Sequence, residues 1–198
     1  FPDGNSFMNL NDCKINDRLP IIKRKYGNIQ ILSSQFSGAT MFPVTYEMDS
    51  KSYKKISKRK KYSKFIGVLN SINTISPDVY LPAAGPACFL DSNLFHLNFE
   101  DDNIFPKSWD FENFLRLKDI QVKCRTLMPG DELNIKSLNI NIYNKSLSLN
   151  KLSLRDYLSN YQSKNFYKKK NINFNPEVFI NKLLKNFKEK ILVFSHFT

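Results

Sequence analysis

The first half of the chain alternates between short apolar runs and longer segments with helical periodicity. The runs Phe7–Leu10, Asn28–Ser34 and Val79–Leu81 are typical of strands. From Ser50 to Thr74, apolar side chains recur at steps of three and four residues, which predicts a long helix. A short helix or turn is expected between Asn16 and Gly27. Strands that alternate with helices in this way predict an α/β layered domain.

The second half of the chain carries a weaker pattern. Ser108–Leu117 has helical periodicity with acidic residues in its first turn, and we expect Ser108 or Asp110 to cap its start. The remaining predicted elements are strands at Gln121–Leu127 and Ser137–Asn144, a turn at Pro129–Gly130, and helices at Ser153–Tyr167 and Pro176–Lys188.

Each of the three strands predicted in the first half ends in a short polar or small-residue segment. These segments are "NDC" at 11–13, "QFSGA" at 35–39 and "PAAGPA" at 82–87. In α/β sheets, ligands collect outside the carboxyl ends of the strands, so the three ends predict one shared crevice. The loop Gln35–Pro43 is nearly uncharged although the chain is rich in lysine, which suits a ligand better than water. Tight packing between layers is the alternative for these loops.

Asp12 stands at the end of the first predicted strand, where a carboxylate is placed to meet a metal ion or a sugar hydroxyl. The alternative is a turn closed by its side chain, or a cap for the following segment. His96 and His196 are the only histidines, too few for a His-rich zinc or iron site, and His96 is expected to pack at an interface or cap a polar group. A complete metal site would therefore need residues from outside this chain.

The charge is strongly basic. The formal net charge is +12 and the isoelectric point is about 9.6. A basic footprint is one sign of nucleic-acid binding. Most lysines are scattered, however, and the one dense run, Lys54–Lys61, lies on the predicted long helix. A phosphate-bearing small molecule or an acidic partner would use the same charge, and nucleic acid is not the expected partner.

Several classes of protein lack their motifs here. Cys13, Cys88 and Cys124 have no paired spacing, which favours reduced thiols in a cytoplasmic protein. The sequence contains no G-x-S-x-G, Walker A or GxGxxG motif, and no apolar run approaches the roughly 18 residues that cross a membrane. The chain starts without an initiator methionine or a signal peptide and ends in a strand-like run, so we expect a fragment of a longer protein.

Several short motifs follow one another between Ile29 and Phe111. They are "LSSQFSGATMFPVTYEM", "KRKKYSKFIGVLNSINTISPDVYLPAAGPACFLDSNLF" and "PKSWDF", with "LMPGDEL" beyond. In this order they resemble the CMP-N-acetylneuraminate hydroxylase family, which includes UDP-N-acetylmuramate hydroxylases and similar Rieske-linked proteins. The preceding "NLNDC" looks like the strand that brings an acidic metal ligand in the metallo-β-lactamase fold, on which this family is built.

The resemblance implies an α/β fold: the C-terminal half of a metallo-β-lactamase-like αββα sandwich at residues 1–92, with an α-rich C-terminal extension at 93–198. It implies a Rieske-type iron-sulfur monooxygenase-like protein, incomplete in this chain, that hydroxylates the N-acetyl group of a nucleotide sugar (CMP-sialic acid or UDP-muramic acid type). The implied cofactor is iron, mononuclear or as a [2Fe–2S] cluster in the missing N-terminal part. The implied partners are the nucleotide-sugar substrate, a redox carrier protein for electron delivery and the missing N-terminal half, with no membrane.

The resemblance also implies roles for individual residues. Asp12 would contribute to a metal site at the floor of the crevice. Gly38 would let the backbone turn tightly and approach a ligand, and the aromatic rings of the first loop would stack on a base or sugar. The residues expected to bind substrate are Gln35, Phe36, Ser37, Gly38, Thr40, Phe42, Pro82 and Gly85. Ala83 and Pro86 replace a Phe and a Tyr of the family pattern, which alters the shape of the second loop.

Two other functions remain open from the sequence. One is a metallo-β-lactamase-fold hydrolase that uses zinc and acts on a phosphoester or lactone. The other is a basic nucleic-acid-binding module without catalysis. The family pattern "PFAGY", like "PAAGP" here, lacks the terminal His ligand of many hydrolases of that fold, which favours the hydroxylase branch.

Overall fold

A computed structural model describes residues 1, 4–38, 40–128, 130–143, 151–162 and 181. The chain divides into two compact units, 1–162 and 163–198. Each helix and strand with described bounds belongs to the first unit. The predicted helix Pro176–Lys188 and His196 lie outside the described residues.

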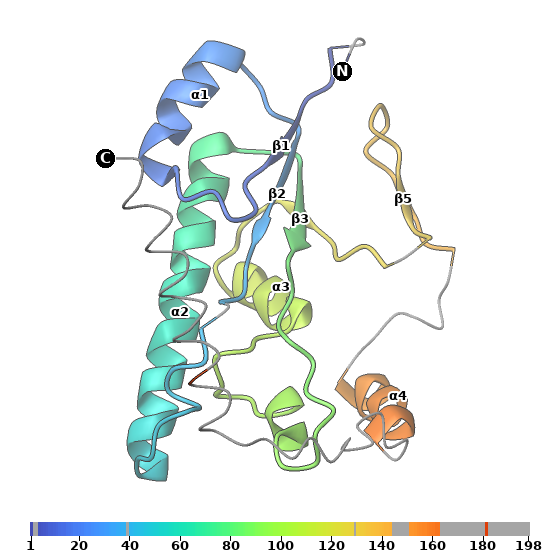
Figure 1. Cartoon of the computed structure of the whole chain (residues 1–198). Helices are drawn as coiled ribbons and strands as arrows, with labels where there is room; N and C mark the ends of the chain where they lie inside the picture. Colours follow the sequence, from blue (N-terminus) through green and yellow to red (C-terminus); the bar gives the residue numbers. More distant parts are fainter. Residues whose placement is uncertain (2–3, 39, 129, 144–150, 163–180, 182–198) are drawn as a thin grey trace. The chain divides into compact units, whose positions relative to one another are not determined.

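A four-stranded sheet forms the centre of the first unit (Figure 1). All of its strand pairs are parallel, and the order in the sheet follows the order in the chain. Parallel neighbours place their carboxyl ends at one edge, as the predicted crevice requires. The strands are β1 (Phe7–Asn9), β2 (Ile31–Gln35), β3 (Val79–Ala83) and β4 (Lys123–Cys124).

Each pair of neighbouring strands is joined through a helix. The connections contain α1 (Leu19–Tyr26), α2 (Ser50–Ile75) and α3 (Ser108–Leu117), and α2 contacts both of the other helices. The three helices therefore form one layer (Figure 1). Short 3-10 turns stand at Asn16–Arg18 and Phe95–Asn98.

The bounds of α2 and α3 follow from local chemistry. The Asp49 carboxylate accepts a hydrogen bond from the Ser52 N–H (2.9 Å) at the start of α2. At its end, Ser76 has φ +53 and its N–H donates to the Ile72 carbonyl. The start of α3 differs from the prediction: Lys107 is the capping residue, and the Asp110 carboxylate accepts the Lys107 N–H (2.7 Å) from the first turn.

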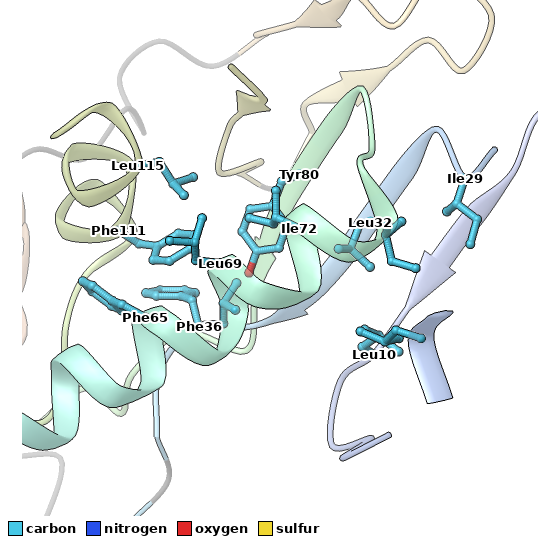
Figure 2. Close-up of a cluster of buried hydrophobic side chains, with 13 residues drawn as sticks. Leu10, Ile29, Leu32, Phe36, Phe65, Leu69, Ile72, Tyr80, Phe111 and Leu115 are labelled. Atoms are coloured by element: carbon cyan, nitrogen blue, oxygen red, sulfur yellow. The ribbon is translucent and has the colours of Figure 1, made fainter. Parts of the chain in front are cut away.

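The main hydrophobic core lies between the sheet and the helix layer. Figure 2 shows Phe36, Phe65 and Phe111 side by side, from the end of β2, from α2 and from α3. The Phe111 ring is fully buried and lies 5.0 Å from Phe65, 5.5 Å from Tyr80 and 6.2 Å from Phe36 between ring centroids. The Tyr80 hydroxyl lies 3.0 Å from Ser34 Oγ, so even the polar end of this ring is satisfied.

A second, smaller core fixes the segment between β3 and α3. It consists of Leu97, Ile104 and Phe105, with Met41, Val44 and Phe89 packed against them. The Asn98 side chain ties this segment to the backbone of Phe89: it accepts the Phe89 N–H (3.0 Å) and donates to the Phe89 carbonyl (2.6 Å). The predicted loops after β2 and β3 both lead into this second core, the first through Met41 and Val44 and the second through Phe89.

The rest of the first unit contains little regular structure. The predicted strands at 121–127 and 137–144 appear as β4 and as the second strand of a small antiparallel hairpin. The predicted helix 153–167 appears as α4, whose final predicted residues lie outside the described part of the chain. The hairpin and helix are β5 (Glu132–Leu133), β6 (Ile140–Asn141) and α4 (Lys151–Gln162).

The metallo-β-lactamase-like half-sandwich and the boundary at residue 92 stay predictions. Residues from both sides of that boundary share the sheet, since β4 pairs with β3. No helix in the described part of the chain is both long and apolar enough to cross a membrane.

We expect Phe111→Ala to lower the free energy of unfolding by about 3–5 kcal/mol, because it leaves a cavity among four aromatic rings. Denaturant titration followed by circular dichroism measures the change. Leu117→Ala, on the same helix but 81% exposed, is the matched control and should change it by less than about 0.5 kcal/mol. Equal effects of the two variants would contradict this description of the core.

Candidate functional site

A cavity of the first unit lies where the segments after β1 and β2 meet α2. Its volume is about 620 Å3. Leu10, Val68, Ile104 and Pro106 give it an apolar lining, and Ile104 also belongs to the second core. We call this cavity the basic pocket because its polar lining is dominated by Lys and Arg side chains, described below.

Four of the predicted site residues line the basic pocket. They are Asp12, Gln35, Gly38 and Thr40. The ends of β1 and β2 thus converge, as expected from their parallel pairing. The Thr40 hydroxyl accepts a weak bond from the Phe42 N–H (3.3 Å), which orients it within the loop.

The other predicted residues lie elsewhere. Phe36, Pro82 and Gly85 line a second pocket of about 220 Å3, so the end of β3 does not share the basic pocket. Ser37 is fully buried, and its hydroxyl donates to the Gly38 carbonyl (3.4 Å). Phe42 is exposed and packs edge-on against Tyr46. The expected single crevice is therefore two pockets in the structure.

The rim near Asp12 is built by a tight turn after β1. The Leu10 N–H donates to the Ser33 carbonyl (2.8 Å), which extends the pairing one residue beyond the strand. The Asn11 N–H then donates to Asn9 Oδ1 (2.9 Å), and Asp12 adopts a left-handed conformation with φ +57. The side-chain turn considered for Asp12 is thus made by Asn9. The Asp12 carboxylate is left exposed at the pocket rim.

A wall of cationic side chains in this pocket was not predicted from the sequence. Arg59, Lys60, Lys61 and Lys64 of α2 line it, and Lys14 faces them from the segment after β1. The sequence contained the signal: residues 60, 64, 67, 68 and 71 recur at helical spacing, so one face of α2 carries both the lysines and the small residues that line the pocket.

The pocket disfavours the charged form of Lys64. Burial lowers the pKa of the Lys64 ammonium, and the positive charge of Lys14 lowers it further, while the Asp12 carboxylate partly raises it. The Lys60 ammonium lies 4.8 Å above the Phe42 ring, and the Lys61 ammonium donates to the Asp101 carbonyl. Phe42 does not line the pocket, but its ring makes a cation–π contact with Lys60, which does.

The second pocket contains one cation and one thiol between apolar walls. Burial lowers the pKa of the Lys107 ammonium, an effect that the Cys88 thiolate, when it forms, and the Asp110 carboxylate oppose. Burial also raises the pKa of the Cys88 thiol. Its walls include the aromatic side chains of Phe36 and Trp109. The pocket is small and largely apolar, and it shares no lining residue with the basic pocket.

A metal site does not fit the basic pocket. Asp12 is its single carboxylate, and five cationic side chains line the same cavity. Among the described residues, no group of three or more His, Cys, Asp or Glu side chains is arranged to hold a metal ion. His96 instead lies 3.5 Å from the Glu100 carboxylate, consistent with its expected polar contact. The described residues therefore hold no complete iron or zinc site by themselves, and the metal-binding role of Asp12 stays a prediction.

We expect Gly38→Ala to change the free energy of unfolding by less than about 0.5 kcal/mol. An added Cβ would meet only Thr40 Cγ2, at 3.8 Å, and Gly38 lacks the positive φ that requires glycine. Gly27→Ala is the comparison, because φ +75 at the end of α1 makes it cost about 1 kcal/mol or more. Chemical denaturation measures both, and a large loss for Gly38→Ala would show that this glycine serves the fold.

Cys13 and Cys124 should react with iodoacetamide at very different rates. Cys13 is exposed at the basic pocket, whereas burial and the nearby Glu112 charge raise the pKa of the Cys124 thiol. Each unit of increase in pKa reduces the thiolate fraction about tenfold, so labelling of Cys124 should be more than about tenfold slower. Peptide mass spectrometry over time measures both rates. Equal rates would contradict the burial of Cys124.

The chain is similar to proteins from two mycobacterial species. It is 30% identical over 137 residues to proteins named "Putative Rieske 2Fe-2S iron-sulfur protein" in two strains of Mycobacterium tuberculosis, CDC 1551 and H37Rv. That alignment covers 68% of this chain and 26% of each relative. A protein of the same description in Mycolicibacterium smegmatis is 30% identical over 113 residues, covering 56% of this chain and 22% of the relative.

The other comparisons found no match. No protein-family model matches the chain, and no solved structure matches it. The chain spans about a quarter of the length of the relatives. The similarities connect it to proteins named for a Rieske [2Fe–2S] cluster, and the names contain no substrate.

Proposed function

We propose that this chain is part of a Rieske-type oxygenase-like protein that hydroxylates the N-acetyl group of a nucleotide sugar. The observation that carries the proposal is the similarity to Rieske-named proteins, which extends over two thirds of the chain. The sequence motifs between Ile29 and Phe111, which resemble CMP-N-acetylneuraminate hydroxylases, support the substrate class. The protein would be an oxidoreductase whose catalytic centre includes segments beyond the described residues.

The basic pocket is the substrate site in this proposal. It has the volume of a typical small-molecule site, at about 620 Å3. The Gln35 amide and the Thr40 hydroxyl offer hydrogen bonds to sugar hydroxyls, and Gly38 leaves its backbone open to a ligand. The apolar lining, including Leu10 and Ile104, suits the flat faces of a base or sugar.

The iron chemistry is assigned to other parts of the protein. The described residues lack a ligand set for an iron ion or a [2Fe–2S] cluster, so no step of the oxidation is attributed to them. Their proposed contribution is to bind and orient the nucleotide sugar. A redox carrier protein would deliver electrons, and the N-terminal half of the same protein would hold the cluster.

A metal-dependent hydrolase is the competing function. It also needs a metal site that the described residues do not form, and the names of the relatives do not favour it. The two functions differ in their products: the oxygenase adds one oxygen atom from O2, whereas the hydrolase adds water and needs no electron donor.

The test uses the complete protein that contains this chain, purified with its bound metals. CMP-N-acetylneuraminate and UDP-N-acetylmuramate are each incubated with isotopically labelled O2, NADH and a redox carrier protein, and products are analysed by mass spectrometry. We expect one product in which the N-acetyl group has gained a single labelled oxygen atom. Omission of NADH is the control and should abolish it. Cleavage of substrate that does not depend on NADH would contradict the proposal and favour the hydrolase.

A further inference from the structure

The cations of the basic pocket have few internal counter-charges. Arg59, Lys60, Lys61, Lys64 and Lys14 line the cavity with a single carboxylate, that of Asp12. Within the described residues, the recorded ion pairs are Arg18–Asp17 and His96–Glu100, and neither involves a pocket residue. The protein therefore holds like charges together around a partly enclosed space.

Such an arrangement costs free energy in the absence of a ligand. Lys64 is partly buried, and the burial and the Lys14 charge both disfavour its ammonium form. An anion between these side chains would reverse both effects, because it replaces lost hydration and offsets the repulsion. The cavity also offers the hydroxyl of Ser63 on the same helix, which can donate to an anionic oxygen. The Ser71 hydroxyl is engaged with the Gly67 carbonyl (3.2 Å) and Asn16 Oδ1 (3.3 Å).

The positive charges near Asp12 argue against a metal ion at its carboxylate. A divalent cation at Asp12 would have one carboxylate ligand and would approach the ammonium groups of Lys14 and Lys64, which act on the same region. Metal sites in proteins gather several oxygen, nitrogen or sulfur donors, not a single carboxylate among cations. The Asp12 carboxylate instead partly offsets the Lys14 and Lys64 charges.

We infer that the basic pocket is an oxyanion site that binds a phosphate or pyrophosphate group through Lys14, Lys60 and Lys64, and that Asp12 is a charge partner of these lysines and not a metal ligand. Lys60 is positioned for this role by the Phe42 ring beneath its ammonium. Lys61 contributes less, because its ammonium is engaged by the Asp101 carbonyl. This assignment deepens the proposed function by naming what the pocket holds, but phosphate binding does not require oxygenase activity.

The first experiment measures binding of inorganic pyrophosphate to this chain by isothermal titration calorimetry. Lys64→Met keeps most of the aliphatic stem and removes the charge, so we expect affinity to fall about tenfold or more. Lys64→Arg should stay within about threefold of the original chain. Lys55→Met is the matched control on the exposed part of α2, outside the pocket, and should change affinity less than about twofold.

Circular dichroism and unfolding of each variant separate loss of binding from loss of folding. Pyrophosphate should also slow iodoacetamide labelling of Cys13, which lines the pocket, in the original chain but not in Lys64→Met. Equal weakening by Lys64→Met and Lys55→Met, or no protection of Cys13, would overturn the inference. Tighter binding of a single-stranded oligonucleotide with equal dependence on both lysines would instead indicate a nucleic-acid surface.

The second experiment separates the anion site from a metal site at Asp12. Removal of the carboxylate charge by Asp12→Asn should leave pyrophosphate affinity unchanged or increase it, because a competing negative charge is lost. The original chain should show no saturable binding of Mn2+ or Zn2+ that depends on Asp12. Tight metal binding that Asp12→Asn abolishes would overturn the inference. Pyrophosphate binding by a complete protein that fails to hydroxylate nucleotide sugars would refute the proposed function alone.

Discussion

The parallel pairing of β1 and β2 is the constraint on which the candidate site depends. In a parallel pair both strands run toward the same edge, so the chain after Asn9 and the chain after Gln35 emerge as neighbours. An antiparallel pair would have sent them to opposite edges. The Leu10–Ser33 hydrogen bond continues this pairing past the strand and brings Asp12 alongside the loop that holds Gly38. The helix that returns the chain to β3 then forms the remaining wall.

The two pockets are separated because Phe36 is a core residue. Its side chain is 2% exposed and contacts Phe111, which fixes the first residue after β2 inside the helix–sheet core. The following residues Gly38 and Thr40 line the basic pocket with α2, whereas Phe36 lines the second pocket with the loop after β3. Aromatic packing that stabilises the fold therefore also determines which polar groups can meet one ligand.

The sequence predicted the elements well and the site in part. The strands and the long helix followed from apolar periodicity, because burial of one face leaves a regular spacing. The burial of Phe36 and Ser37 is not visible in the sequence, because a small polar loop and a buried strand end look alike there. In the sequence the lysines of α2 form only a charged run, because tertiary packing decides which other segment of the chain faces them. The place of Asp12 was predictable from strand direction, but its surroundings were not.

The long helix α2 combines two functions that usually conflict. Its C-terminal part buries Phe65, Leu69, Ile72 and Ile75 in the main core, which holds the helix in place. Its N-terminal part carries the lysine-rich run. Like charges on successive turns repel one another, so such a run is tolerated where packing further along the helix supplies the stability. Because this packing holds the helix backbone, only the lysine side chains have to lose freedom when a ligand binds. Burial of the C-terminal part of α2 in the core therefore offsets the repulsion between the lysines, and their charge is available to bind an anionic ligand.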